Sequence, residues 1–244
     1  MAVIIIPARK GSTRLKNKLL LHVKGKPVIQ WTAENCLRVK NASRVIVATD
    51  SQEIADIFEN SPIEAVLTPS DLNSGSDRVA YVAKNLQEEK IINVQGDEPL
   101  LEPSDIEKVI EALNEAQIST LAYPIQNEED YLNPNVVKVV IDKKGYALYF
   151  SRSPIPFYRD IDFSQMIKNF ETPVLKHIGV YGYKKEALMD FAFALSQTTY
   201  EQIEKLEQLR LLENGYRIKV IKASKDTLGI DTKEDFEKFC QIVS

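Results

Sequence analysis

The positive charge of this 244-residue chain is concentrated near its start. Residues 1–33 contain seven Lys and Arg side chains and no acid, whereas the whole chain has a net charge of −4. Five of these cations fall between Arg9 and Lys18, around Gly11-Ser12-Thr13. Backbone amides and hydroxyls of such a stretch can bind phosphate oxygens, with Arg giving forked contacts and Lys a point charge. A charge run by itself favours a solvated basic loop, but its position directly after the first expected strand makes a polyphosphate site about equally compatible.

Two carboxylates are candidates for binding a divalent cation. Asp97 lies in the sequence Gln-Gly-Asp-Glu-Pro directly after an apolar run, and Asp231 directly precedes Thr232, where a helix is expected to begin. Mg²⁺ usually takes one or two carboxylates together with phosphate oxygens. A turn that accepts backbone amides is an equally ordinary use for Asp97, and helix capping is one for Asp231.

Short polar side chains at 73–78, Asn-Ser-Gly-Ser-Asp-Arg, are suited to binding a base or a ribose. Arg78 in the first turn of a helix opposes the helix dipole, which favours a ligand or an ion pair as its partner. His22 and His177 are the only histidines, and each alone indicates a structural role. The chain lacks the P-loop, dinucleotide-binding and serine-hydrolase motifs, which excludes those three classes.

Composition sets the broad class. Hydrophobic residues make up 44% and charged residues 27%, as in globular proteins. No uncharged run approaches the ~20 residues of a membrane span. The apolar start lacks the basic region of a signal peptide. Cys36 and Cys240, which lie far apart, cannot make a zinc site, and a disulfide scaffold would be denser in cysteine. We therefore expect a cytoplasmic protein that contacts no membrane and, being acidic outside its first 33 residues, binds no nucleic acid.

Strands and helices are expected to alternate and so to position these residues. Strands are predicted at 2–7, 44–49, 63–67, 91–95, 118–123, 177–183 and 216–222, with a hairpin formed by 136–142 and 146–151. Helices are predicted at 27–40, 51–60, 77–87, 104–116, 185–194, 200–213 and 232–242, with a long loop at 152–176. Repeated strand–helix units predict an α/β fold with a parallel sheet between two helical layers. Ligands then bind beyond the carboxyl ends of the strands, which selects the segments 8–18, 68–78 and 95–99.

The ordered set of segments resembles one family, the 3-deoxy-manno-octulosonate (Kdo) cytidylyltransferases. The similar stretches are IIIPARKGSTRLKNK, VIVATD, NSGSDR, NVQGDEPL, NPNVVKVV, GYALYFSRSPIP, KHIGVYGY, EQIEKLEQLRLLENG and GIDTKEDFEK, and they extend from residue 4 to residue 238. The resemblance implies that CTP and Kdo react to give CMP-Kdo and pyrophosphate for lipopolysaccharide biosynthesis, with Mg²⁺ as cofactor. It also implies one Rossmann-like domain of the nucleotide-diphospho-sugar transferase type over 1–244, with a small β-containing insertion at about 127–183 that forms a homodimer.

The resemblance also implies roles for particular residues. The catalytic residues would be Arg9, Arg14, Lys18 and Asp97. CTP would be bound by Arg9, Gly11, Ser12, Arg14, Lys18, Ser74, Gly75 and Arg78, and Mg²⁺ by Asp97 and Asp231. The sugar acid would be bound by Gln95, Arg152, His177, Tyr181, Glu207 and Gln208, with Arg152 as the partner of its carboxylate.

One departure from the family pattern affects the basic segment. Lys16 and Leu19 stand where the family usually has prolines, and because proline restricts the backbone, we expect a more mobile loop before nucleotide binds. Alternative functions are cytidylyl transfer to a related acidic sugar, namely 8-amino-Kdo or a sialic acid, and nucleotide binding by a non-catalytic regulator. The segments EKLEQLR and YFSRSPIP argue against sialic acid, and the presence of both Asp97 and Asp231 argues against the regulator.

Overall fold

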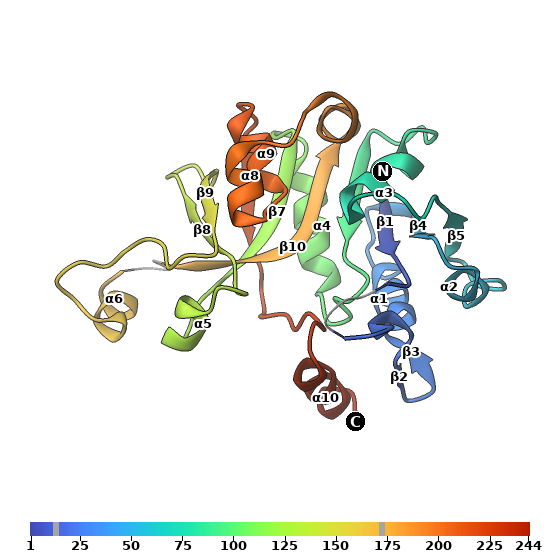
Figure 1. Cartoon of the computed structure of the whole chain (residues 1–244), viewed down its shortest axis with the longest axis horizontal. Coiled ribbons are helices and arrows are strands. Elements are labelled where there is room, and N and C mark those ends of the chain that lie inside the picture. Colours follow the sequence, from blue (N-terminus) through green and yellow to red (C-terminus); the bar gives the residue numbers. More distant parts are fainter. Residues whose placement is uncertain (12–14, 171–173) are drawn as a thin grey trace.

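A nine-stranded sheet organises the chain (Figure 1). The computed structural model describes residues 1–11, 15–170 and 174–244. Within these ranges seven strands follow the order β11-β7-β10-β6-β1-β4-β5, and β8 and β9 extend the sheet from β10. The strands are β1 (Ala2–Ala8), β4 (Ala42–Thr49), β5 (Glu64–Leu67), β6 (Lys90–Val94), β7 (Ile118–Pro124), β8 (Lys138–Ile141), β9 (Ala147–Ser151), β10 (Leu175–Lys184) and β11 (Ile218–Lys222).

The sheet is mostly parallel, as the alternating pattern predicts. β1 pairs in parallel with β4 and β6, β4 with β5, and β7 with β11. β10 is the exception among these strands, because it lies antiparallel between β6 and β7. β7 and β10 are neighbours in the sheet, and residues 125–174 connect them. This connection differs from the helical crossover that joins parallel strands, and β10 runs antiparallel to β7.

Helices cover both faces of the sheet, as predicted. The α-helices are α1 (Val28–Cys36), α2 (Gln52–Asp56), α3 (Gly75–Ala83), α4 (Pro103–Ala112), α5 (Glu128–Leu132), α6 (Phe163–Asn169), α7 (Lys185–Met189), α8 (Thr199–Glu204), α9 (Gln208–Glu213) and α10 (Lys233–Ile242). A 3₁₀ turn, η1 (Lys18–Leu20), precedes α1, and a π-helical turn, η2 (Asp190–Ala194), follows α7.

Strand β1 shows how the two layers arise. All seven of its residues are buried, and successive side chains of a strand point to opposite faces. Ile4 and Ile6 belong to the hydrophobic cluster that contains Ile29 of α1 and Ile106 of α4. Val3 and Ile5 belong to the opposite cluster, together with residues of α3, α7 and α9. Burial on both faces holds β1 in the centre of the sheet, so the basic segment that follows β1 begins at the carboxyl end of a central strand.

The segment expected to be an insertion extends to one side of the sheet (Figure 1). It contains α5, the β8–β9 hairpin and α6, and it has a small hydrophobic cluster of its own that includes Tyr131, Phe163 and Met166. The expectation of a long loop over 152–176 is wrong for α6. That helix begins with a capping box in which Asp162 accepts from Gln165 N–H, a signal masked by the prolines upstream.

Smaller differences concern helix ends. The helix expected over 200–213 is divided into α8 and α9 at Lys205, which has a left-handed backbone (φ 54°). Ser104 is not an N-cap, because Glu102 holds that position and Pro103 starts α4. Asp50 and Ser51 do not cap α2 through a side chain. The predicted Thr232–Asp235 capping box of α10 is confirmed.

Part of the basic N-terminal region forms a short hairpin that the sequence pattern does not predict. β2 (His22–Val23) and β3 (Lys26–Pro27) pair through a turn in which Lys24 and Gly25 both have positive φ.

Among the described residues, no helix is long and apolar enough to cross a membrane.

Candidate functional site

A cavity of about 280 Å³ opens where β1 and β6 end and α3 begins. The basic segment, the 68–78 segment and the 95–99 segment all contribute to its wall, together with two residues from the last third of the chain. Its lining consists of Pro7, Arg9, Gly11, Leu15, Lys18, Leu19, Leu72, Asn73, Ser74, Gly75, Arg78, Gln95, Gly96, Asp97, Glu207 and Asp231. The strand order thus brings distant polar segments to one edge of the sheet.

Two glycines allow these segments to approach closely. A Cβ at Gly96 would lie 2.9 Å from Ile29 Cδ1 and 3.3 Å from the carbonyl oxygen of Pro7. A Cβ at Gly75 would lie 3.3 Å from Pro7 Cγ. The absence of a side chain at both positions lets the loop after β6 and the start of α3 pack against the end of β1.

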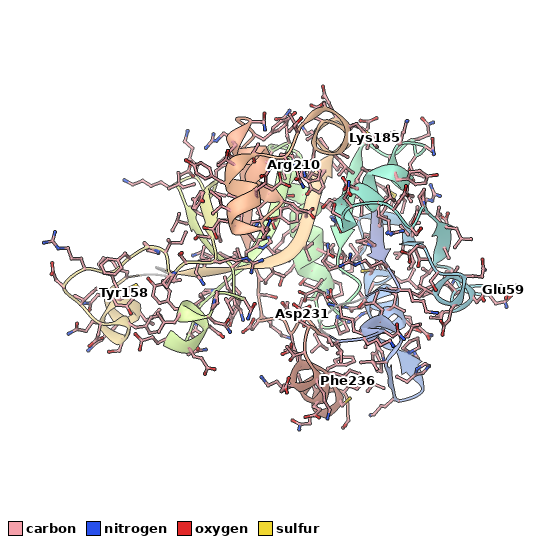
Figure 2. The ribbon with its side chains drawn as sticks, viewed as in Figure 1. Glu59, Tyr158, Lys185, Arg210, Asp231 and Phe236 are labelled. Atoms are coloured by element: carbon pink, nitrogen blue, oxygen red, sulfur yellow. The ribbon has the colours of Figure 1, made fainter. Side chains whose placement is uncertain are left out.

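The wall of the cavity holds a lysine between two carboxylates. Lys18 Nζ donates to Asp97 Oδ2 and, at 2.8 Å, to Asp231 Oδ1. The Ile230 N–H donates to the carbonyl oxygen of Asp97 at 2.9 Å, which holds the C-terminal segment in place and delivers Asp231. Figure 2 shows Asp231 between the sheet and α10. Burial acts to lower the pKa of Lys18, but the two carboxylates outweigh it and the pKa is raised.

The donor set at this point fits a divalent cation. One ammonium group already reaches both Asp97 and Asp231, so one metal ion could bridge the same two carboxylates, and carboxylate oxygens are ligands that Mg²⁺ prefers. Over the described ranges no cluster of three or more His, Cys, Asp or Glu residues could hold a metal. A metal at this pair would therefore need further oxygens from a ligand or water.

Glu98 lies beside this centre in a different state. Burial, with the neighbouring charge of Asp97, raises the pKa of Glu98 to about 8. Its Oε2 is buried without a hydrogen-bond partner in the described structure. A Cβ at Gly229 would lie 2.9 Å from Glu98 Oε1, so the C-terminal segment packs directly on this carboxyl group. Glu98 is therefore mainly protonated at neutral pH.

The start of α3 forms the opposite side of the cavity. Ser74 is the N-cap of α3, and its Oγ accepts from Asp77 N–H at 3.1 Å. Arg78 lines the cavity, yet its guanidinium donates to Thr68 Oγ1, to the carbonyl oxygen of Pro69 at 3.2 Å and to Asp50 Oδ2 at 3.2 Å. Arg78 thus has protein partners, and Asp50 is a residue of this region that the sequence analysis missed.

The residues expected to bind the sugar acid fall into three groups. Gln95 and Glu207 line the cavity. His177 and Tyr181 on β10 do not line it, and their rings lie 5.2 Å apart. Gly179 between them lies against Gln95, because a Cβ there would be 3.5 Å from Gln95 Cγ. Burial lowers the pKa of His177 to about 3, so its imidazole is neutral at physiological pH.

The remaining predicted residues lie elsewhere. The Arg152 guanidinium donates to the carbonyl oxygens of Glu204 at 2.7 Å and Pro134 at 3.0 Å, and it does not line the cavity. Gln208 is buried in the first turn of α9 and does not line it either. Ser12 and Arg14 lie outside the described residues.

Comparison with known proteins gives a consistent result. The family model described as "Cytidylyltransferase" matches residues 3–221. The 3-deoxy-manno-octulosonate cytidylyltransferase of Trichlorobacter lovleyi is 46% identical, covering 97% of this chain and 96% of the relative. That of Chloroherpeton thalassium is 45% identical, covering 100% and 98%.

Two solved structures are similar over nearly the whole chain. A CMP:2-keto-3-deoxy-manno-octonic acid synthetase complexed with CTP is similar, with a TM-score of 0.90 and 36% identity, covering 99% of this chain and 98% of that one. The 4-diphosphocytidyl-2C-methyl-D-erythritol synthase of Anaerococcus prevotii shares the fold. Its TM-score is 0.67 and its identity 18%, covering 99% of this chain and 97% of that one.

The Lys18 contact predicts competition between its ammonium and a metal ion. We expect Lys18→Gln to raise the affinity for Mg²⁺ without nucleotide by about fivefold or more, since a unit charge some 4 Å away is worth about 1 kcal/mol even in water. Isothermal titration calorimetry with Mg²⁺ alone measures this, with the exposed Lys16→Gln in the same segment as the control. Equal affinities in the wild type and Lys18→Gln would show that the ammonium does not compete.

Glu98 predicts a pH-dependent stability. Its pKa in the folded chain is raised from 4.5, so its contribution to the free energy of unfolding is complete below about pH 4.5 and is lost as the pH rises through about 8. Between about pH 6 and about pH 9 the wild type should therefore lose more stability than Glu98→Gln in urea unfolding. Glu59→Gln, on the surface, is the control (Figure 2). Parallel curves for the wild type and Glu98→Gln would refute the assignment.

Proposed function

The chain belongs to the 3-deoxy-manno-octulosonate cytidylyltransferase family, and from this premise we propose how its residues carry out the reaction. The enzyme transfers the cytidylyl group of CTP to Kdo and forms CMP-Kdo and pyrophosphate. We place the reaction in the cavity because Lys18 contacts Asp97 and Asp231 there and because the basic segment lines the same cavity. We further propose that the reaction takes place in the cytoplasm and supplies lipopolysaccharide assembly.

CTP spans the cavity in this proposal. Its phosphates lie against the basic segment, where Arg9 and Lys18 supply positive charge and Gly11 an open backbone, with Ser12 and Arg14 from the same segment. Its cytidine lies at Ser74 and Gly75, where the N-terminus of α3 presents backbone N–H groups. The wall is cationic on the phosphate side and formed by short polar residues on the nucleoside side, which matches the two ends of a nucleotide.

Asp97 and Asp231 would hold the Mg²⁺ ion of the reaction. When bound, Mg²⁺ neutralises phosphate charge and polarises the phosphoryl oxygens. The chain's own part is to keep the two carboxylates close: the Ile230 N–H holds the backbone of Asp97, and Lys18 offsets the repulsion between the carboxylates in their ligand-free state. The Lys18 ammonium also lies within the basic segment, from which it can bind phosphate oxygens.

Kdo would enter beside Gln95 and Glu207, next to the CTP phosphates. Its anomeric hydroxyl oxygen forms a bond to the α-phosphorus and loses its proton to water. The bond from that phosphorus to pyrophosphate breaks, and its electron pair leaves with the pyrophosphate. Positioning and charge stabilisation supply the catalysis in such a transfer. His177 and Tyr181 would support this side from β10 through the contact of Gly179 with Gln95, because neither lines the cavity. The neutral His177 imidazole already pairs with Thr120 Oγ1 through Nε2 at 3.0 Å. Arg152 can reach the sugar carboxylate only by leaving its carbonyl partners at the end of α8.

The 127–183 segment would form a homodimer interface. Phe157 and Phe170 expose 82% and 57% of their surface. Together with Pro156, Tyr158, Arg159, Ile161 and Met166 they line an apolar hollow of about 490 Å³. Exposed aromatic side chains gathered around a hollow are typical of protein–protein interfaces. Figure 2 shows Tyr158 well to one side of Asp231, which lines the cavity, so such an interface would lie away from the active site.

The metal assignment predicts a loss of turnover. Asp97→Asn should fold like the wild type and release pyrophosphate from CTP and Kdo at least about 100-fold more slowly, the scale seen when one preorganised charge contact is lost. Asp71→Asn, which changes an exposed carboxylate that does not line the cavity, is the control. Near-normal turnover at saturating Mg²⁺ would contradict the role of Asp97. Release with 8-amino-Kdo or N-acetylneuraminate in place of Kdo would instead change the sugar assignment.

The interface proposal predicts a change of assembly. Phe157→Ser should convert a dimer into a monomer, or lower its dimerisation affinity at least about tenfold, because an exposed aromatic at the centre of an interface commonly contributes about 2 kcal/mol or more. Light scattering after size exclusion measures the mass. Phe193→Ser, which removes an aromatic side chain that is 60% exposed on η2, is the matched control. A wild-type monomer, or an unchanged dimer in Phe157→Ser, would refute this interface.

A further inference from the structure

Asp50 links two walls of the cavity through one carboxylate. It directly follows β4, next to the end of β1. Its Oδ1 accepts from the backbone N–H of Lys10 at 3.0 Å, and its Oδ2 accepts from the Arg78 guanidinium at 3.2 Å. Lys10 belongs to the basic segment and Arg78 to α3. Asp50 therefore links the basic segment to α3, two parts of the cavity wall that are far apart in the sequence.

The α3 side of this link is buried and hydrogen-bonded to three protein groups. The Arg78 side chain is 3% exposed and that of Asp50 is 15% exposed. The other donors of Arg78 bind Thr68 Oγ1 and the carbonyl oxygen of Pro69, and Thr68 in turn donates to the carbonyl oxygen of Thr49 from its N–H at 2.8 Å and its hydroxyl at 3.0 Å. Hydrogen bonds of a charged group are stronger when the group is buried away from water, as Arg78 is. These bonds therefore hold α3, the 68–69 turn and the end of β4 together as one rigid unit.

Both ends of the link lead directly to cavity residues. Arg9 and Gly11 flank Lys10 in the chain and line the cavity, whereas Asp50 does not. Ser74 and Gly75 lie one helical turn before Arg78 and also line it. A change at Asp50 would therefore reach a bound ligand only by changing the relative positions of these two walls.

We propose that Asp50 is a positioning residue that sets the separation between the phosphate-binding segment and the nucleoside-binding start of α3. This inference rests on the CTP placement proposed above and deepens it. A ligand with two binding ends gains affinity when both ends engage at once, and that gain depends on a fixed distance between the two subsites. Loss of the link leaves each subsite intact but removes this gain.

Binding of the whole nucleotide and of its two halves separates this role from simple stabilisation. Dissociation constants for CTP, cytidine and tripolyphosphate are measured by calorimetry with the wild type and Asp50→Asn. The asparagine keeps the volume and one acceptor but presents an amide donor to Lys10 N–H or to Arg78. CTP should bind about tenfold or more weakly, whereas cytidine and tripolyphosphate change less than about twofold. The KM for CTP should rise while the KM for Kdo does not.

Two further variants make the test robust. Asp50→Glu keeps the charge but lengthens the link by one methylene, so it should show the same selective loss even if Asp50→Asn folds poorly. Glu53→Gln removes an exposed ion pair with the Lys10 side chain, 2.8 Å long, and should change none of the three affinities.

The outcomes distinguish this inference from the placement on which it rests. Unchanged CTP binding in both Asp50 variants, or equal losses for CTP and its halves, would overturn the positioning role. Arg9→Gln serves as the reference for the placement, because it should weaken both CTP and tripolyphosphate. If Arg9→Gln weakens CTP and the Asp50 variants do not, only the present inference fails. If Arg9→Gln has no effect, the CTP placement fails and the inference falls with it.

Discussion

The bridge of Lys18 to Asp97 and Asp231 is the interaction on which the site depends. It joins three parts of the chain that are far apart in sequence: the basic segment after β1, the turn after β6 and the segment before α10. Two carboxylates this close repel each other unless a cation lies between them, so the ammonium permits the arrangement in the ligand-free chain. The same electrostatic demand is met by a divalent cation. The two carboxylates are therefore already in place for a metal ion, because the Lys18 ammonium, with a single positive charge, holds them together in its absence.

The C-terminal segment can take part in this bridge because a separate hydrophobic cluster holds it. Val23, Val28, Ile230 and Phe239 are its buried members, and the rings of Trp31 and Phe239 meet edge to face at 5.8 Å. The cluster lies under the β2–β3 hairpin and α1, outside the two large clusters against the sheet, and Figure 1 shows α10 below the sheet at the end of an extended segment. Ile230 and Phe239 are the buried members that the C-terminal segment supplies, and their burial at roughly 1.5–3 kcal/mol each stabilises α10 against the hairpin and α1. The short β2–β3 hairpin thus matters for the site even though none of its residues lines the cavity.

Much of this arrangement could be predicted from the sequence, because it depends on local pattern. The apolar β-branched runs identify β1, β4 and β6, and the rule that ligands bind at the carboxyl ends of strands selects the three segments that line the cavity. The antiparallel direction of β10 could not be predicted. The residue pattern of one strand does not show whether the strand is parallel or antiparallel to its neighbours, because the arrangement of the whole sheet determines its partners. Helix α6 was missed because three prolines nearby outweighed its capping box. The role of Asp50 was missed because its position before α2 suggested a helix cap, whereas both of its oxygens bind residues distant in sequence.

Arginines show where residue type stops being informative. Arg9, Arg78 and Arg152 each have the donors that suit a phosphate or a carboxylate, and sequence alone treats them alike. In the fold, Arg78 binds Asp50, Thr68 and Pro69, and Arg152 binds backbone carbonyls at the end of α8. A guanidinium with three protein partners exchanges those bonds if it binds a ligand, so its net gain is small compared with that of a guanidinium exposed to solvent. Arg9, which is exposed at the cavity, can contribute its charge to CTP directly, whereas Arg78 contributes by fixing the wall on which the nucleoside rests.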